Sequence, residues 1–162
     1  MNLLNTSKNK IVLTIVSATA FSLPIYLATP LMAQQTSSLI QQLLKTKECS
    51  SCNLIGAQLG GSNLIGANLS NSDLTNAKLD VALLENANLT GAKLNGANLN
   101  NATLQNANLA GAKLGSANLA GANLKNANLA GAILTNADLT NANLEGAKLD
   151  GANLTGAIGI KK

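Results

Sequence analysis

Leucine recurs at every fifth position from Leu54 to Leu154, 21 times in succession. The residue two places before each leucine is alanine, with replacements only at Cys52, Ser62 and Ser72. A period of five matches neither an α-helix, which repeats every 3.6 residues, nor a strand, which repeats every two. The chain must therefore bend regularly to keep both columns inward, which predicts a coil with a narrow leucine and alanine core.

The position two residues after each leucine is almost always glycine or asparagine, the residue types that tolerate turn geometry and positive φ. The positions directly flanking leucine are mostly polar and are expected to face water. The chain has no Trp, no His, one Tyr and one Phe. A conventional globular core is therefore excluded, and a thin repetitive core is favoured.

Units such as Ala67-Asn68-Leu69-Ser70-Asn71 and Ala122-Asn123-Leu124-Lys125-Asn126 resemble the A-(D/N)-L-x-x unit of the pentapeptide repeat family. The resemblance implies an all-β fold, a right-handed quadrilateral β-helix with four pentapeptides per coil. We expect this solenoid to span residues 52–157, followed by a C-terminal tail at 158–162. Residues twenty apart would then share a face, which predicts two ion pairs, Asp73 with Lys93 and Lys125 with Glu145.

The N-terminus has the features of an export signal, assigned to residues 1–33. Lys8 and Lys10 precede a long apolar stretch that Pro24 interrupts, and Ala33 offers a small residue for cleavage. The alternative is an uncleaved membrane anchor. Removal of the leader predicts a protein without membrane attachment in the periplasm, the thylakoid lumen or the secreted fraction. The segment from Leu43 to Cys52 resembles exported cyanobacterial members of the family.

Residues 34–51 are expected to form a capping segment. Leu39, Ile40, Leu43 and Leu44 have helical spacing, which predicts a short amphipathic helix over residues 37–48 with a serine as N-cap. Such a helix could cover the first coil. No comparable cap is evident after Leu154, so the far edge is open to a partner or to end-to-end self-association.

Cys49 and Cys52 are the only cysteines, and both fall in inward columns. In an exported protein the pair is readily oxidised, so we predict a disulfide that staples the start of the solenoid. A thiol/disulfide redox role is the alternative, but the flanking βαβ pattern of thioredoxin-like proteins is missing. A haem attachment site would require histidine where Asn53 stands, and two thiols alone do not complete a zinc site.

The sequence predicts neither an enzyme nor a cofactor or metal site. There is no histidine, and the seven acidic residues are scattered singly rather than grouped. Loss of Lys8 and Lys10 with the leader leaves nine lysines against those seven, without a basic run, so nucleic-acid binding is not expected.

The leading prediction is a non-catalytic extracytoplasmic structural or protein-interaction module. Some pentapeptide repeat relatives mimic DNA and bind type II topoisomerases, but those rods are strongly negative, and five lysines oppose the six acids of this array. Several outward positions are apolar. Among them Ile65 and Leu83 are predicted to lie on one face in adjacent coils and to form a partner patch.

Overall fold

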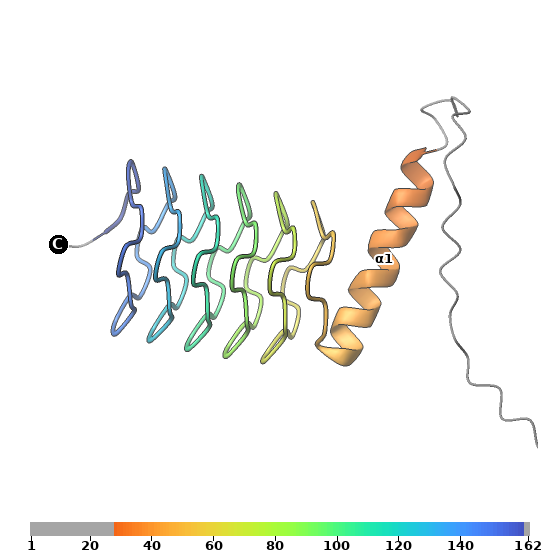
Figure 1. The fold of residues 1–162 in the computed structure, drawn as a ribbon, viewed down its shortest axis with the longest axis horizontal. Helices are drawn as coiled ribbons and strands as arrows, with labels where there is room; N and C mark the ends of the chain where they lie inside the picture. Colours follow the sequence, from red (N-terminus) through yellow and green to blue (C-terminus); the bar gives the residue numbers. More distant parts are fainter. Residues whose placement is uncertain (1–27, 161–162) are drawn as a thin grey trace, which may run out of the picture.

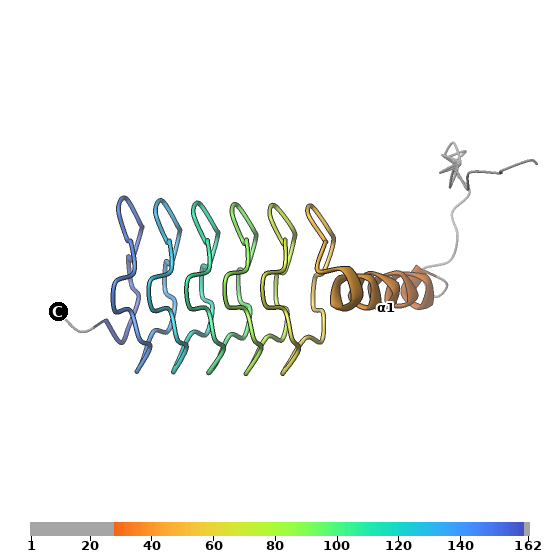
Figure 2. The ribbon, with the colours of Figure 1, turned by 90° about the horizontal axis from the view of Figure 1, so that it is seen from below.

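The computed structural model describes residues 28–160. Helix α1, Ala28–Thr46, lies at one end of the molecule and is followed by a rod of stacked coils that runs to the other end (Figures 1 and 2). The coils are joined by single-residue parallel β-bridges, the first between Glu48 and Asn68 and the last between Asp138 and Ile158. The ladder thus begins four residues before the expected solenoid boundary at Cys52.

Each bridge joins a residue to the residue twenty positions later. Hydrogen bonds in both directions fix this register: the Leu69 N–H donates to the Asn88 carbonyl at 2.8 Å, and the Asn88 N–H donates to the Ala67 carbonyl at 2.8 Å. The register corresponds to four five-residue units per coil, as the resemblance implied. Side chains twenty residues apart therefore stack in columns along the rod.

The two inward columns form the core. Within these two columns, every leucine from Leu54 to Leu139 is at most 1% exposed, and the alanines from Ala57 to Ala137 are almost equally buried. A buried leucine contributes about 1.5–3 kcal/mol through removal of apolar surface from water. Ser72, in the alanine column, is also buried, and its hydroxyl donates to the Leu69 carbonyl. Burial is thus regular along the rod, as the five-residue period predicts.

Helix α1 is longer at its N-terminus than the sequence predicted. It begins at Ala28, because Pro30 is tolerated in a first turn and no helix breaker follows before Thr46. The prediction of a start at Ser37 or Ser38 was therefore wrong. The helix ends where Lys47 adopts φ 62°, a left-handed conformation typical of helix C-termini. No helix within residues 28–160 is long and apolar enough to cross a membrane.

The end of α1 that joins the rod packs against its core. Leu43 is fully buried, and Leu39 and Ile40 are partly buried against the same cluster. Leu44, which the sequence placed on the packing face, is instead 39% exposed. One residue turns the helix by 100°, and this rotation carries Leu44 away from the side on which Leu43 packs. The N-terminal end of α1 diverges from the first coil (Figures 1 and 2).

Candidate interaction surface and cysteine junction

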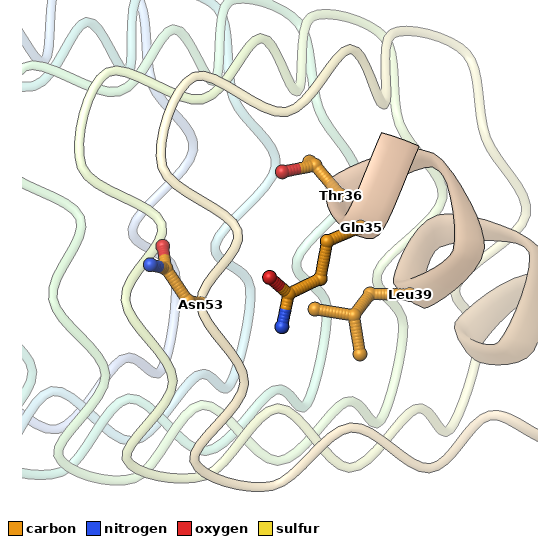
Figure 3. Close-up of a pocket in the computed structure, with 4 residues that line it drawn as sticks. All are labelled: Gln35, Thr36, Leu39 and Asn53. Atoms are coloured by element: carbon orange, nitrogen blue, oxygen red, sulfur yellow. The ribbon is translucent and has the colours of Figure 1, made fainter. Parts of the chain in front are cut away.

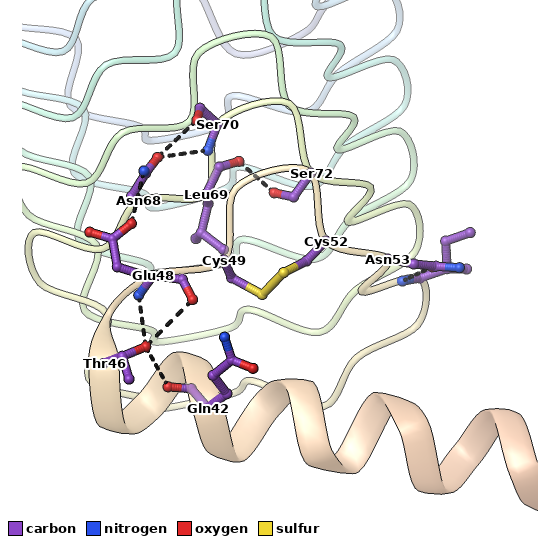
Figure 4. Close-up of a disulfide and its surroundings, with 11 residues drawn as sticks. Gln42, Thr46, Glu48, Cys49, Cys52, Asn53, Asn68, Leu69, Ser70 and Ser72 are labelled. Carbon is purple, nitrogen blue, oxygen red and sulfur yellow. Dashed lines mark hydrogen bonds between the residues drawn. A yellow bond between two sulfur atoms is a disulfide. The ribbon is translucent and has the colours of Figure 1, made fainter. Parts of the chain in front are cut away.

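The cysteine junction lies where the chain leaves α1 and enters the first coil (Figure 4). The Cys49 and Cys52 sulfurs are bonded in this structure, and their Cα atoms are 5.4 Å apart. Both side chains belong to the inward columns, as predicted. Cys49 is 3% exposed and Cys52 is half-buried, so solvent reaches the pair mainly from the Cys52 side.

Side-chain hydrogen bonds surround this junction. The Thr46 hydroxyl donates to the Gln42 carbonyl at 2.8 Å and accepts from the Glu48 N–H at 3.2 Å (Figure 4). The Glu48 carboxylate in turn accepts from the Asn68 side-chain amide at 3.0 Å. These bonds fix the direction in which the chain turns from helix to coil. No group of three or more potential metal-binding side chains occurs within the described residues.

A shallow pocket separates α1 from the first coil. Gln35, Thr36 and Leu39 line it from the helix and Asn53 from the coil (Figure 3). Its volume is about 50 Å³, whereas pockets for organic ligands usually measure about 300–1,000 Å³. The pocket has room for very few water molecules, so it does not provide a small-molecule site.

The predicted partner patch lies over the first two coils. The bridge between Asn63 and Leu83 places the segment containing Leu83 directly against the one containing Ile65. Ile65 is 43% exposed, but Leu83 is only half-buried, so it offers less surface than predicted. Val81, in the turn before Leu83, is 52% exposed. We define Ile65, Val81 and Leu83 as the apolar patch.

Val81 is also conformationally unusual. It stands in the turn column that otherwise holds mainly glycine and asparagine, and its φ is 50°. Positive φ is rare for a β-branched residue, because the branched side chain crowds the backbone. In the sequence, Val81 stands where glycine or asparagine is usual, but only the structure reveals that it is both strained and exposed.

Two predicted ion pairs are confirmed. The Lys93 ammonium lies 3.1 Å from the Asp73 carboxylate, and Lys125 lies 2.9 Å from Glu145. A hydrogen bond from the Thr75 hydroxyl, together with the Lys93 ammonium, lowers the pKa of Asp73 below its ordinary value. Hydrogen bonds from Thr140 likewise lower the pKa of Asp138. Within residues 28–160, which comprise α1 and the rod, seven lysines balance seven acidic residues, so this part of the chain has no formal net charge.

A family profile described as "Pentapeptide repeats (8 copies)" matches residues 49–80, 82–119 and 117–156. The chain belongs to the pentapeptide repeat family. Members of this family form right-handed β-helices and are generally structural or interaction proteins. The family assignment thus agrees with the resemblance seen in the repeated A-(D/N)-L-x-x units and with the twenty-residue register of the ladder.

Several solved pentapeptide repeat proteins are similar to the chain. Rfr23 from the cyanobacterium Cyanothece 51142 is 36% identical, with 75% of this chain and 97% of that one covered and a TM-score of 0.49. HetL, involved in heterocyst differentiation regulation in Nostoc, is 32% identical over 68% and 71% of the two chains, with a TM-score of 0.36. A protein from the Arabidopsis thaliana thylakoid lumen is 35% identical over 64% and 65%, with a TM-score of 0.32. No curated protein sequence matches the chain.

Proposed function

We propose that this pentapeptide repeat protein is a non-catalytic structural or protein-interaction module that works outside the cytoplasm. The observation that carries the proposal is the apolar patch, which interrupts the mostly polar outward columns of the first two coils. Single exposed apolar side chains are ordinary, but several on neighbouring segments of one face favour a contact surface. Val81, which has a strained backbone and is 52% exposed, supports a role of the patch in recognition rather than in folding.

Two paired substitutions test this proposal. Ile65→Lys with Leu83→Lys places two charges in the patch, whereas Gln105→Lys with Asn123→Lys places them at the same relative positions two coils further along. The protein, purified with its partners from its own compartment, should lose at least one co-purifying protein with the first pair only. An unchanged set of partners with the first pair would refute the role of the patch.

Export is proposed from the leader at residues 1–33. Residues 1–27 lie outside the described residues, and residues 28–33 form the start of α1 in the uncleaved chain. Cleavage after Ala33 would leave a helix beginning at Gln34, which retains Leu39, Ile40 and Leu43. N-terminal sequencing of the protein from periplasmic, lumenal and secreted fractions should return Gln34 as the first residue. Recovery of the intact N-terminus in the membrane fraction would instead indicate an anchor.

We further propose that Cys49 and Cys52 form a structural staple and that α1 caps the first coil. Leu54, Leu59 and Leu64 at the α1 end are fully buried, whereas Leu149 and Leu154 at the other end are only half-buried. The burial of Cys49 leaves only the half-buried Cys52 sulfur open to thiol/disulfide exchange, which favours a structural role. Intact mass after alkylation, with and without prior reduction, should show one disulfide, and the protein should not accelerate insulin reduction.

Mimicry of DNA is not supported by the charges of the rod. Mimics depend on a strongly negative surface, and residues 28–160 carry equal numbers of lysines and acidic residues. Two of the acidic residues are, in addition, paired with lysines. We therefore expect no inhibition in a gyrase supercoiling assay with the leaderless protein.

A further inference from the structure

A carboxylate lies beside the apolar patch with one oxygen that water does not reach. Glu85 stands two residues after Leu83 and twenty after Ile65, so it shares their face of the rod. Its backbone is fixed against the preceding coil, because the Gly66 N–H donates to the Glu85 carbonyl at 2.8 Å. The residue as a whole is half-buried, and its Oε2 atom is buried and forms no hydrogen bond within residues 28–160. A charged oxygen in this position lacks the stabilisation that a donor or water supplies.

No lysine of the described chain forms an ion pair with Glu85. Two lysines that reach this face of the rod are engaged elsewhere. Lys125, two coils further along the same column, lies 2.9 Å from Glu145. The Lys47 ammonium donates to the Asn63 carbonyl. The Glu85 carboxylate is therefore free to pair with a group of another molecule.

The segments that form and surround the apolar patch contain acidic residues and no lysine. Residues 79–92 include two acidic residues, and the segments that stack on them in the neighbouring coils, residues 59–72 and 99–112, carry no charge. One of the two acidic residues, Asp80, directly precedes Val81, so the patch has a carboxylate on either side along the chain. An apolar surface with acidic margins is complementary to a partner that presents apolar and basic side chains together.

Arginine is the basic side chain that fits this carboxylate best. Its planar guanidinium donates two parallel hydrogen bonds to the two oxygens of a carboxylate, whereas the lysine ammonium acts as a point charge. The guanidinium is also more weakly hydrated, and its aliphatic stem packs on apolar side chains, so it can approach an oxygen that water does not reach. The terminal torsion of a glutamate is soft, and rotation about it turns the inward oxygen outward. A bound arginine thus supplies the donor that Glu85 Oε2 lacks among the described residues.

We propose that the apolar patch and Glu85 together bind a protein segment in which an arginine is flanked by apolar residues. The arginine pairs with the Glu85 carboxylate, and the apolar residues cover Ile65, Val81 and Leu83. This inference rests on the proposed interaction role of the patch and specifies the chemistry of its partner. Apolar contacts alone would satisfy the proposed function, so loss of the arginine preference refutes only the present inference.

Titration of the purified full chain with two synthetic peptides tests the proposal. The first peptide has arginine between leucines, and the second has citrulline, an uncharged group of nearly the same shape, in place of the arginine. Chemical shifts of the amides in residues 65–66 and 81–86 should change on binding, and the arginine peptide should bind about tenfold more tightly at low salt. Glu85→Gln should remove this preference, because an amide forms no ion pair. Glu145→Gln, the same change in the same column, should leave the preference intact.

A measurement without peptide separates binding from a structural role of Glu85. Glu85→Leu should raise the midpoint of thermal unfolding of the free protein, because it removes a charged oxygen that is buried without a partner. Glu145→Leu is the control and should not raise the midpoint, since Glu145 is exposed and paired with Lys125. A lower midpoint for Glu85→Leu would show that Glu85 serves the fold itself and would contradict the proposal.

The peptide and partner experiments each have an outcome that overturns the inference. No shift with the arginine peptide, equal affinities for the two peptides, or an arginine preference that survives Glu85→Gln would each exclude the pairing with Glu85. In the co-purification experiment, a partner lost with Ile65→Lys and Leu83→Lys but retained with Glu85→Gln would refute this inference alone. Retention of every partner with the double substitution would refute the proposed role of the patch as well.

Discussion

At the scale of single residues, the residue type two places after each repeat leucine, the turn column, determines where the backbone is relaxed and where it is strained. Every described glycine in the turn column has φ between 64° and 72°, and the asparagines in this column have φ between 54° and 59°. Asparagine tolerates this region because its short side chain can hydrogen-bond locally, whereas β-branched residues are crowded. Val81 is therefore the residue at which stability is most readily gained.

Val81→Asn should stabilise the protein by about 1 kcal/mol, since it removes a β-branched side chain from the left-handed region. The free energy of urea unfolding measures the change. Ile133→Asn is the control, because Ile133 is a similarly exposed apolar residue outside the positive-φ set. Equal effects of the two substitutions would mean that exposure, not backbone strain, determines the change.

Gly91 and Gly111 separate backbone strain from side-chain crowding. Both have φ 66° in the same column, but a Cβ at Gly91 would lie 2.5 Å from Asn71 Oδ1, whereas a Cβ at Gly111 would meet nothing within 4 Å. Gly91→Ala should therefore destabilise the protein more than Gly111→Ala in thermal unfolding. Addition of Asn71→Gly should reduce the cost of Gly91→Ala to that of Gly111→Ala; no reduction would contradict the crowding.

The lowered pKa of Asp73 predicts that the stability of the protein depends on pH. Its pKa is lowered in the folded state, mainly by the Thr75 hydroxyl with help from Lys93, so the charged carboxylate stabilises the fold above its ordinary pKa of 3.8. That contribution, under about 1 kcal/mol for a partly exposed pair, is lost as the pH falls through the folded-state value. Asp73→Asn keeps an acceptor for Thr75, so its deficit should be present at pH 7 and vanish in acid. A deficit independent of pH would contradict this origin.

At the scale of elements, α1 and the coils were predictable to different degrees. The five-residue period determines the inward columns without reference to any structure, because only regular bending keeps leucine and alanine inside. The extent of α1 was less predictable, since residues 31–36 contain neither a breaker nor a strong cap. The side on which Leu44 falls depends on the angle at which the helix meets the rod, which no local pattern encodes.

Leu43 and Leu44 provide a matched test of the cap. Leu43→Ala should cost about 2–4 kcal/mol, because Leu43 is fully buried against the core, whereas Leu44→Ala should change stability by less than about 0.5 kcal/mol. Hydrogen exchange should accelerate in residues 48–64 with Leu43→Ala and remain unchanged in the central coils. Equal exchange in the two variants would show that α1 does not protect the first coil.

At the scale of the whole molecule, the regular five-residue repeat makes the fold predictable from the sequence but gives little information about function. The ion pairs of Asp73 with Lys93 and of Lys125 with Glu145 followed from one assumption, four units per coil. The half-burial of Leu83 and the backbone of Val81 did not, because they depend on local packing around a departure from the repeat. Candidate contacts accordingly lie at the apolar patch, at Glu85 beside it and at the cysteine junction.

The surface columns of the rod, and with them the apolar patch, depend on the stacking of residues twenty positions apart. Cysteine cross-linking tests this stacking most directly. Asn88 and Asn108 form a bridge in adjacent coils, within the Cα separation that a disulfide spans. Asn88→Cys with Asn108→Cys should therefore cross-link under mild oxidation, while Asn88→Cys with Thr103→Cys should not, as measured by peptide mass mapping. Cross-linking of the second pair in place of the first would contradict four units per coil and the column map built on it.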